Sequence, residues 1–470
     1  MRRFSRALVA AVAVTSCPAI AAANGRFPQT NQIVYDFGGG PDLAARTTFG
    51  VLVSHDRGAT FHWVCEQVVG YAGNQDPGIG LFGDGSLAVA AFEGLLVSHD
   101  GGCSWQKIGN GLENEYVIDV AIQRGAPLRG VAVTSTGMTG GKFHVQAWST
   151  IDGAKTWTPA GVQLPIDLLA ETIDVAPSDP QRLYVSGTFV DSGGTKQGAI
   201  EVSADGGGSW TRTVVDLGGD QSIFVAGVDP IDPLRVYVRT RGSGKDAADG
   251  GVVDRLLVSK DGGGSFQQAA AIGGPMSGFA LSPNGARVAI GSVAEGLLVA
   301  ARDDLAFVSV AKKAIQCLAW SPDGLYACGS DFADGYVIGR TIDEGKTFVP
   351  LIPKLADVGG PLATCAAGSA YEAECLPLWP MLGEQYGIGT TGSGGSAGGG
   401  ASPAGSAAAA GSSGNAMPAA VTPAKGGCGC GAAGSDAGGG AIALLSASFA
   451  ALFAASRRKR RDTARAPVRE

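Results

Sequence analysis

Short apolar runs alternate with turns rich in Gly, Asp, Asn, Ser and Pro from about residue 31 to residue 355, a pattern typical of β-strands joined by tight turns. The stretch 95–105 shows the unit clearly. Leu95–Val97 is an apolar strand, Ser98–Gly102 a glycine-rich turn, and Trp105 opens the returning strand. An Asp side chain accepts hydrogen bonds from backbone N–H groups of such a turn, and glycine allows positive φ there. We therefore predict a β-hairpin whose turn is held by Asp100.

This hairpin recurs at intervals of 44 to 56 residues, apart from one interval of 82 residues between Asp261 and Asp343. At the middle of that long interval, residues 297–307 align on 256–266 and keep the strand and the aromatic residue but lack the Asp. A second turn, built on Pro and Asp or Asn, precedes most of the hairpins. Seven repeats of this length predict an all-β, seven-bladed β-propeller of four-stranded blades over residues 31–355. The Asp turns centre on Asp56, Asp100, Asp152, Asp205, Asp261 and Asp343, and Trp105, Trp157 and Trp210 close three of them.

The six turns resemble the Asp-box (BNR) repeat of sialidase-like β-propellers, Ser/Thr-x-Asp-x-Gly-x-x-Trp/Phe. The resemblance implies that the six aspartates are structural and lie on the outer rim, away from the central pocket. Gly25–Pro28 matches part of the motif that precedes the first repeat in sialidases, where Arg26 would bind the substrate carboxylate. Neither the two further arginines nor the Tyr–Glu pair of a sialidase is evident. The alternative, Gly-rich disorder with accidental matches, is disfavoured by the regular spacing.

The N-terminus, with Arg2, Arg3 and Arg6 before an apolar run, predicts a secretory signal peptide over residues 1–23, cleaved after Ala23. A lipobox ending at Cys17 is the alternative. Either processing route exports the protein.

The C-terminal part divides into three segments. Residues 356–387 predict a disulfide-closed cap, and 388–427, almost entirely Gly, Ala, Ser, Thr and Pro, predict a disordered linker. Residues 428–461 contain Cys428 and Cys430, an apolar run predicting one membrane helix, and a basic cluster that would stay in the cytoplasm. Together they resemble the Myxo-CTERM sorting tail. This implies a tail that first spans the inner membrane, then cleavage near the cysteines and display on the cell surface or outer membrane. A plain membrane anchor is the alternative.

The remaining six cysteines are expected to form disulfides in an oxidising compartment. Cys317 and Cys328 flank a tight turn and face each other across the predicted hairpin. Cys365 and Cys375 are close in sequence, which by elimination leaves Cys65 to pair with Cys103. Reduced, buried thiols are the alternative.

Charge and composition limit the function. The chain has 35 basic and 42 acidic residues. The two termini (1–23 and 457–470) contain ten of the basic and two of the acidic residues, so the chain between them has 25 basic and 40 acidic residues and a net charge of −15. Such an acidic chain offers no footprint for nucleic acid. The four histidines have no ligand spacing, so we expect neither a metal nor a cofactor.

A ligand site is expected in the loops that join the second and third strands of the blades, since loops on a repeat scaffold often form its binding face. The longest, 240–254, follows Arg239 and contains Arg241, Lys245, Asp246 and Asp249. We therefore expect a monomeric, exported and surface-displayed propeller that binds a protein or glycan without catalysis. A surface glycoside hydrolase of the sialidase-like class is the alternative.

Overall fold

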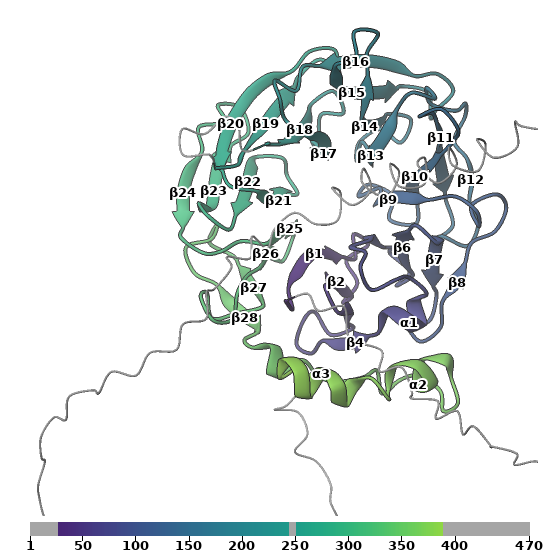
Figure 1. The fold of residues 1–470 in the computed structure, drawn as a ribbon. Helices are drawn as coiled ribbons and strands as arrows, with labels where there is room; N and C mark the ends of the chain where they lie inside the picture. Colours follow the sequence, from purple (N-terminus) through teal and green to yellow (C-terminus); the bar gives the residue numbers. More distant parts are fainter. Residues whose placement is uncertain (1–26, 244–250, 389–470) are drawn as a thin grey trace, which may run out of the picture. The chain divides into compact units, whose positions relative to one another are not determined.

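A computed structural model describes residues 27–243 and 251–388, and in these ranges the chain forms seven antiparallel sheets of four strands each (Figure 1). In every sheet the four strands are hydrogen-bonded in chain order. The first strands of successive blades contact one another around the centre, and the fourth strands lie at the periphery (Figure 1). This confirms the predicted seven-bladed β-propeller, including the blade without an Asp turn.

The blades have the following strands. Blade one comprises β1 (Thr30–Tyr35), β2 (Leu43–Thr47), β3 (Gly50–Ser54) and β4 (His62–Val64); blade two β5 (Gly78–Leu81), β6 (Leu87–Ala91), β7 (Gly94–Ser98) and β8 (Gln106–Lys107); blade three β9 (Val117–Ile122), β10 (Gly130–Gly137), β11 (Phe143–Thr150) and β12 (Thr158–Pro159); blade four β13 (Leu169–Val175), β14 (Leu183–Val190), β15 (Lys196–Ser203) and β16 (Thr211–Val215).

Blade five comprises β17 (Ser222–Val228), β18 (Val236–Arg241), β19 (Val253–Ser259) and β20 (Gln267–Gly273); blade six β21 (Met276–Leu281), β22 (Arg287–Ser292), β23 (Gly296–Ala301) and β24 (Val308–Ala311); blade seven β25 (Cys317–Ser321), β26 (Gly324–Cys328), β27 (Ile338–Thr341) and β28 (Val349–Ile352). A short helix α1 (Glu66–Val69) follows blade one, and a 3-10 turn η1 (Leu355–Asp357) with helices α2 (Ala370–Cys375) and α3 (Trp379–Tyr386) follows blade seven.

Burial follows strand position within a blade. The second and third strands of blade two, β6 and β7, are buried at every residue, because both faces of the sheet pack on neighbouring blades. The outer strand β8 is exposed at both residues. The hydrophobic core is therefore a set of layers between adjacent sheets, such as the cluster of Leu297, Trp320 and Leu325 between blades six and seven.

Polar groups of the first strands join neighbouring blades. The side-chain amide of Gln32 donates to the Ile79 carbonyl and accepts from its N–H, both at 3.1 Å. Asp119 Oδ2 accepts from Ile173 N–H at 3.1 Å, and Thr172 Oγ1 accepts from Val225 N–H at 2.8 Å. These bonds satisfy backbone groups that face the channel and fix each blade against the next.

The ring closes without a shared strand, because blade one contains only β1–β4 and blade seven only β25–β28. After blade seven the chain runs alongside β4 instead. Gly359 N–H donates to the Phe61 carbonyl at 2.8 Å, and Trp63 N–H donates to the Gly360 carbonyl at 2.9 Å. The segment 353–388, which we call the cap, then places α2 and α3 along the edge of blade one (Figure 1).

The disulfides correct part of the sequence prediction. Cys317–Cys328 forms as predicted, across directly paired residues of β25 and β26. The pairings Cys65–Cys103 and Cys365–Cys375 are wrong, since the structure joins Cys65 to Cys375 and Cys103 to Cys365, each with Cα atoms 5.3 Å apart. The cap is therefore bonded to blades one and two rather than closed on itself. Proximity in sequence misled the prediction, because the cap cysteines reach back to partners 310 and 262 positions earlier.

In the described ranges no helix combines the length and apolar character needed to cross a membrane. The predicted signal peptide, linker, membrane helix and sorting cysteines Cys428 and Cys430 all lie outside those ranges.

Candidate ligand-binding site

A β-bulge brings a carboxyl group to the inner edge of blade four. The pairing of β13 with β14 shifts between Ala170 and Thr172, so that Glu171 has no partner on β14. A bulge turns the extra side chain away from the regular alternation of the strand. Equivalent shifts occur in β1, β9, β17 and β21, where the extra residues are Asn31, Ile118, Ala226 and Ser277. Among these five bulges, only that of β13 carries an ionisable side chain.

Glu171 lies against blade five. Its Oε1 accepts a hydrogen bond from the Ser222 hydroxyl, the first residue of β17, at 3.1 Å. Burial raises the pKa of Glu171 to about 7, although Lys196, Arg241 and Arg239 act to lower it. This carboxyl group is therefore poised to exchange its proton near neutral pH.

The Arg239 side chain is supported by an aromatic ring and a carboxylate. Its guanidinium carbon lies 4.5 Å from the centroid of the Phe224 ring, a cation–π contact. Its Nη1 lies 4.0 Å from Asp254 Oδ2, too far for a direct hydrogen bond. Burial lowers the pKa of Arg239, but a guanidinium stays charged at neutral pH. Because no described acceptor is hydrogen-bonded to its N–H groups, the guanidinium can take an external anion.

Two further cations share this end of the blades. Arg241 ends β18, and no hydrogen bond or ion pair joins its guanidinium to a side chain in the described ranges. Lys196 begins β15 and donates from Nζ to the Gln221 carbonyl at 2.6 Å. We call Glu171, Lys196, Ser222, Arg239 and Arg241 the mouth cluster, since they lie where the second and third strands of blades four and five are connected. The predicted site residues Arg239 and Arg241 are thus brought together, while Lys245, Asp246 and Asp249 lie outside the described residues.

Asp254, the second acid beside Arg239, already serves the backbone. Its Oδ1 accepts from Gly242 N–H at 2.9 Å and its Oδ2 from Met276 N–H at 2.8 Å. The residue is 1 % exposed. Its carboxylate therefore ties blade five to blade six and has little freedom to act on a ligand.

The central channel itself has a hollow of about 240 Å³ lined by the first strands of blades one to five. Its acids are also engaged by backbone groups. Asp119 bonds to Ile173 N–H and to Val120 N–H, and Asp174 bonds to Val175 N–H at 2.8 Å. Burial raises the pKa of Asp119 to about 7 and that of Asp174 to about 6. Both residues line this hollow, and Asp119 also joins blade three to blade four.

The six Asp turns share one geometry and lie between the third and fourth strands, far from the channel. In blade four, Asp205 Oδ1 accepts from the Ser203 hydroxyl at 2.8 Å and from Ser209 N–H at 2.9 Å, and Oδ2 accepts from the Ser209 hydroxyl at 2.7 Å. These hydrogen bonds lower the pKa of Asp205. At Asp152, burial acts in the opposite direction, but hydrogen bonds from Thr156 and Thr150 prevail and lower the pKa to about 2. Such carboxylates hold turns and are poorly placed for chemistry on a channel ligand.

The three tryptophans that close Asp turns pack differently from blade to blade. Trp157 is 2 % exposed, within the core between blades two and three. The Trp105 and Trp210 indoles are partly buried and donate to the Gly102 and Val162 carbonyls.

Sequence reasoning missed Glu171, Ser222 and Asp254. The available signal was an acid, Glu171, near the start of a largely apolar inner strand that also contains Asp174. Nothing local indicates the bulge or the approach of blade five, so the sequence pattern alone could not identify the partner residues. In the described ranges no three His, Cys, Asp or Glu side chains gather as a metal site would.

Comparisons with known proteins do not identify a family for this chain. No family model matches the chain, and no curated protein matches it. Solved structures that match include Kuenenia stuttgartiensis hydrazine synthase, which is 13% identical with a TM-score of 0.46 and covers 66% of this chain and 96% of that one. The β-propeller domain of Myceliophteria thermophila Cps50 (Swd1) is 12% identical with a TM-score of 0.42, covering 65% of this chain and 94% of that one.

An enzyme also appears among the matches. The GH74 enzyme of Niastella koreensis is 15% identical with a TM-score of 0.28, covering 68% of this chain and 71% of that one. At such identities and scores these likenesses carry no information about activity, and the function must be argued from the site.

Proposed function

We propose that this protein is an exported, surface-displayed propeller that binds a carboxylate-bearing ligand, a glycan or a peptide, at the mouth cluster without transforming it. The observation that carries the proposal is the Arg239 guanidinium, which rests on Phe224 at 4.5 Å with no hydrogen-bonding acceptor among the described residues. Its rigid fork of N–H donors suits a carboxylate, which it binds through two parallel hydrogen bonds.

The neighbours of Arg239 support anion binding. Arg241 and Lys196 add positive charge on the same end of blades four and five, and the Ser222 hydroxyl adds a polar group. Glu171 opposes an anion when ionised, but its pKa of about 7 means that much of it is protonated at neutral pH. Ligand binding is therefore expected to strengthen as pH falls from about 8 to 6.

The two acidic residues near Arg239, Glu171 and Asp254, suit ligand binding better than glycoside hydrolysis. Glycosidases of the common types need two carboxyl groups that flank the scissile bond, one acid and one base or nucleophile. The mouth cluster has Glu171, while both oxygens of Asp254 are bonded to backbone amides. The raised pKa of Glu171 still suits a general acid, so a glycoside hydrolase is the second candidate.

Export and display rest on the sequence. The basic and apolar N-terminus, the Cys-Gly-Cys segment, the apolar run and the final basic cluster all support them. The three disulfides agree with an oxidising compartment. Protease treatment of intact cells, followed by detection of the chain, tests this part: a displayed protein is digested, and an intracellular one is protected.

The binding part is tested by titration calorimetry of the full chain with uronate- or sialate-terminated oligosaccharides, acidic peptides, and the matched neutral compounds. We expect carboxylate-bearing compounds to bind, and R239A and R241A each to weaken binding at least tenfold, about 1.4 kcal/mol. Lys142→Ala, an exposed lysine in the corresponding loop of blade three, is the matched control. Unchanged affinity in R239A would reject the site.

The same preparation distinguishes the hydrolase. Fluorogenic glycosides are incubated with the wild-type chain and with Glu171→Gln. Steady release of the fluorophore, abolished in E171Q, would replace the binding proposal with catalysis, and no release together with carboxylate binding would support it.

A further inference from the structure

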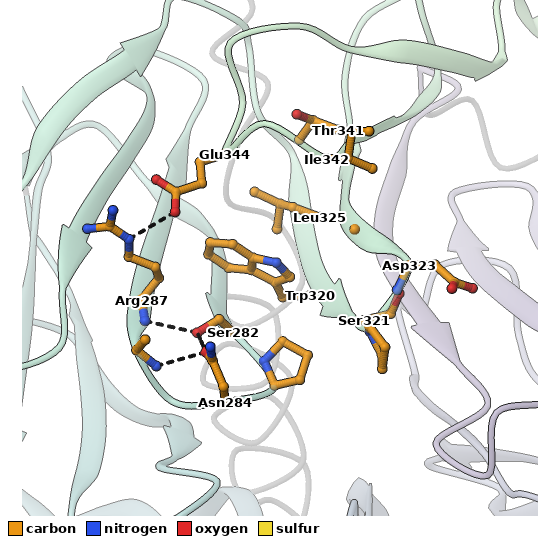
Figure 2. Close-up of a pocket in the computed structure, with 14 residues that line it drawn as sticks. Ser282, Asn284, Arg287, Trp320, Ser321, Asp323, Leu325, Thr341, Ile342 and Glu344 are labelled. Carbon is orange, nitrogen blue, oxygen red and sulfur yellow. Dashed lines mark hydrogen bonds and ion pairs between the residues drawn. The ribbon is translucent and has the colours of Figure 1, made fainter.

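A second hollow lies between blades six and seven (Figure 2). It lies where the first and second strands are connected, whereas the mouth cluster lies where the second and third strands are connected. The hollow measures about 470 Å³. Its lining comes from the turns that join the first two strands in blades six and seven, and from the Asp turn of blade seven. This volume is within the usual range for small-ligand sites.

The two connections that line the hollow are short. Blades four and five join their first and second strands through residues 176–182 and 229–235, seven residues each. Blade six uses only residues 282–286, and blade seven only 322–323. At the joint between blades five and six, the Arg302 side chain of the corresponding turn donates from Nε to Asp229 Oδ2 at 2.5 Å. Between blades six and seven, Glu344 of the Asp turn reaches Arg287 at the start of β22 instead.

The walls combine apolar side chains with one ion pair. Trp320 stands inside the hollow beside Leu325 (Figure 2), and Ile342 at the rim is 84 % exposed. Above the indole, Arg287 Nε donates to Glu344 Oε1 at 2.9 Å, joining blade six to blade seven. Both members of this pair are 42 % exposed, so each presents further donors or acceptors to solvent.

Polar groups continue around the rim. Asn284 Oδ1 accepts from the Ser282 hydroxyl at 2.8 Å and from Ala286 N–H at 3.1 Å, which fixes the amide and leaves its NH2 group as a donor. Asp323 is half exposed and pairs with Arg57 of blade one at 3.1 Å. The charges are thus matched within the protein, and a charged ligand would have to disrupt an existing pair.

We propose that this hollow binds a neutral monosaccharide unit at the end of a glycan. The hydroxyl groups of a sugar donate and accept, so they can bond to Arg287 and Glu344 together without separating them. Only 9 % of Trp320 is exposed, which favours contact with the apolar edge of a sugar ring over stacking on a full indole face. A peptide is a poorer fit, because the walls are turns and offer no sheet edge for main-chain pairing. This site is separate from the mouth cluster and does not rest on the function proposed for it.

The test applies the full chain to an array of neutral and acidic glycans, then measures affinity for the strongest neutral one by calorimetry. We expect retention of neutral glycans and at least a tenfold loss of affinity in the charge-balanced double variant R287A/E344A. Ile342→Ser, which removes exposed apolar surface without touching the core, should weaken binding by a factor of two to five.

The matched control is the double variant D84A/K155A, which removes a similar pair, 3.7 Å apart, at the joint between blades two and three. It should bind as the wild type does, and thermal unfolding of all variants checks that the ring is intact. R239A, which tests the mouth cluster, should leave neutral-glycan binding unchanged. The proposal is overturned if no neutral glycan is retained, if only peptides bind, or if R287A/E344A binds as tightly as the control.

Discussion

Blades four and five are held together differently from blades seven and one. Between blades four and five, the chain passes directly from β16 to β17, and Thr172 Oγ1 and Glu171 bond to Val225 N–H and the Ser222 hydroxyl. Between blades seven and one, the Tyr35 hydroxyl donates to the Trp320 carbonyl at 2.8 Å, but the two blades come from opposite ends of the repeat region in the sequence. The cap supplies the missing covalent continuity through its two disulfides. Consecutive blades thus stay close because the chain is short between them, whereas the closing joint depends on cross-links.

The largest expected effect comes from removing those cross-links. The disulfides Cys65–Cys375 and Cys103–Cys365 span 310 and 262 residues, against 11 for Cys317–Cys328. In the chain-entropy account, loops of a hundred residues or more are worth about 5 kcal/mol and a loop near fifteen about 3 kcal/mol. We expect C65A/C375A to lose more stability than C317A/C328A in denaturant unfolding. An equal loss in the two variants would show that the closing joint is no more dependent on cross-links than a hairpin is.

A smaller effect tests the noncovalent hold of the cap on blade one. The buried Tyr371 hydroxyl donates to the Trp63 carbonyl at 2.5 Å and accepts from Leu362 N–H at 2.8 Å. Tyr371→Phe leaves both backbone groups unsatisfied, with an expected cost of about 1–3 kcal/mol. Thermal unfolding measures it, and faster limited proteolysis of the cap should accompany it. The exposed Tyr116, changed to Phe, is the control and should behave as the wild type.

The Asp turns offer a comparison between blades with and without the carboxylate. Asp205→Ala removes three hydrogen bonds from the turn of blade four, and by analogy with helix caps we expect a loss of about 1–2 kcal/mol. Asp303→Ala alters the corresponding turn of blade six, where Asp303 is 84 % exposed, and should cost less than about 1 kcal/mol. Chemical denaturation of the two variants side by side checks the difference. Equal losses would contradict a local role for the carboxylate.

The smallest effect concerns pH at the joint between blades four and five. Burial raises the pKa of Glu171 to about 7, whereas a Glu in the unfolded chain titrates near 4.3. The folded state therefore holds this proton more tightly, so its stabilising contribution is complete below about pH 4 and is lost as pH rises to about 7. These two pKa values set an upper limit of about 2.5 kcal/mol on the decline in stability between pH 5 and 7.5. Because the Glu171 side chain is only partly buried, we expect Glu171→Gln to remove roughly 1 kcal/mol of that decline. A decline of unchanged size would assign it to Asp119 and Asp174 instead.

The predictions from sequence succeeded where the determinants are local. The blade at 276–311 was found without its Asp because its strands keep their length and apolar character. Cys317–Cys328 was predicted because a tight turn fixes which residues face each other. Arg239 and Arg241 were expected after a second strand, whereas the structure places them in the last three residues of β18, and their role in ligand binding stays a prediction. By contrast, the sequence did not indicate Glu171 as a site residue. Its position depends on a bulge, and the bulge depends on how two strands pair.

The sequence by itself determined the number of blades, the strands within each blade and the hydrogen-bonded Asp turns, because all of these depend on residues close together in the chain. Only the tertiary structure decided how the cap cysteines pair, which acids are engaged by backbone amides and where the hollow between blades six and seven lies. Those features arise where separate blades meet, and their energies depend on distances and burial that no local pattern contains. In a repeat protein the repeating unit can therefore be predicted from the sequence. The joints between units, where the candidate ligand sites also lie, can be described only from the tertiary structure.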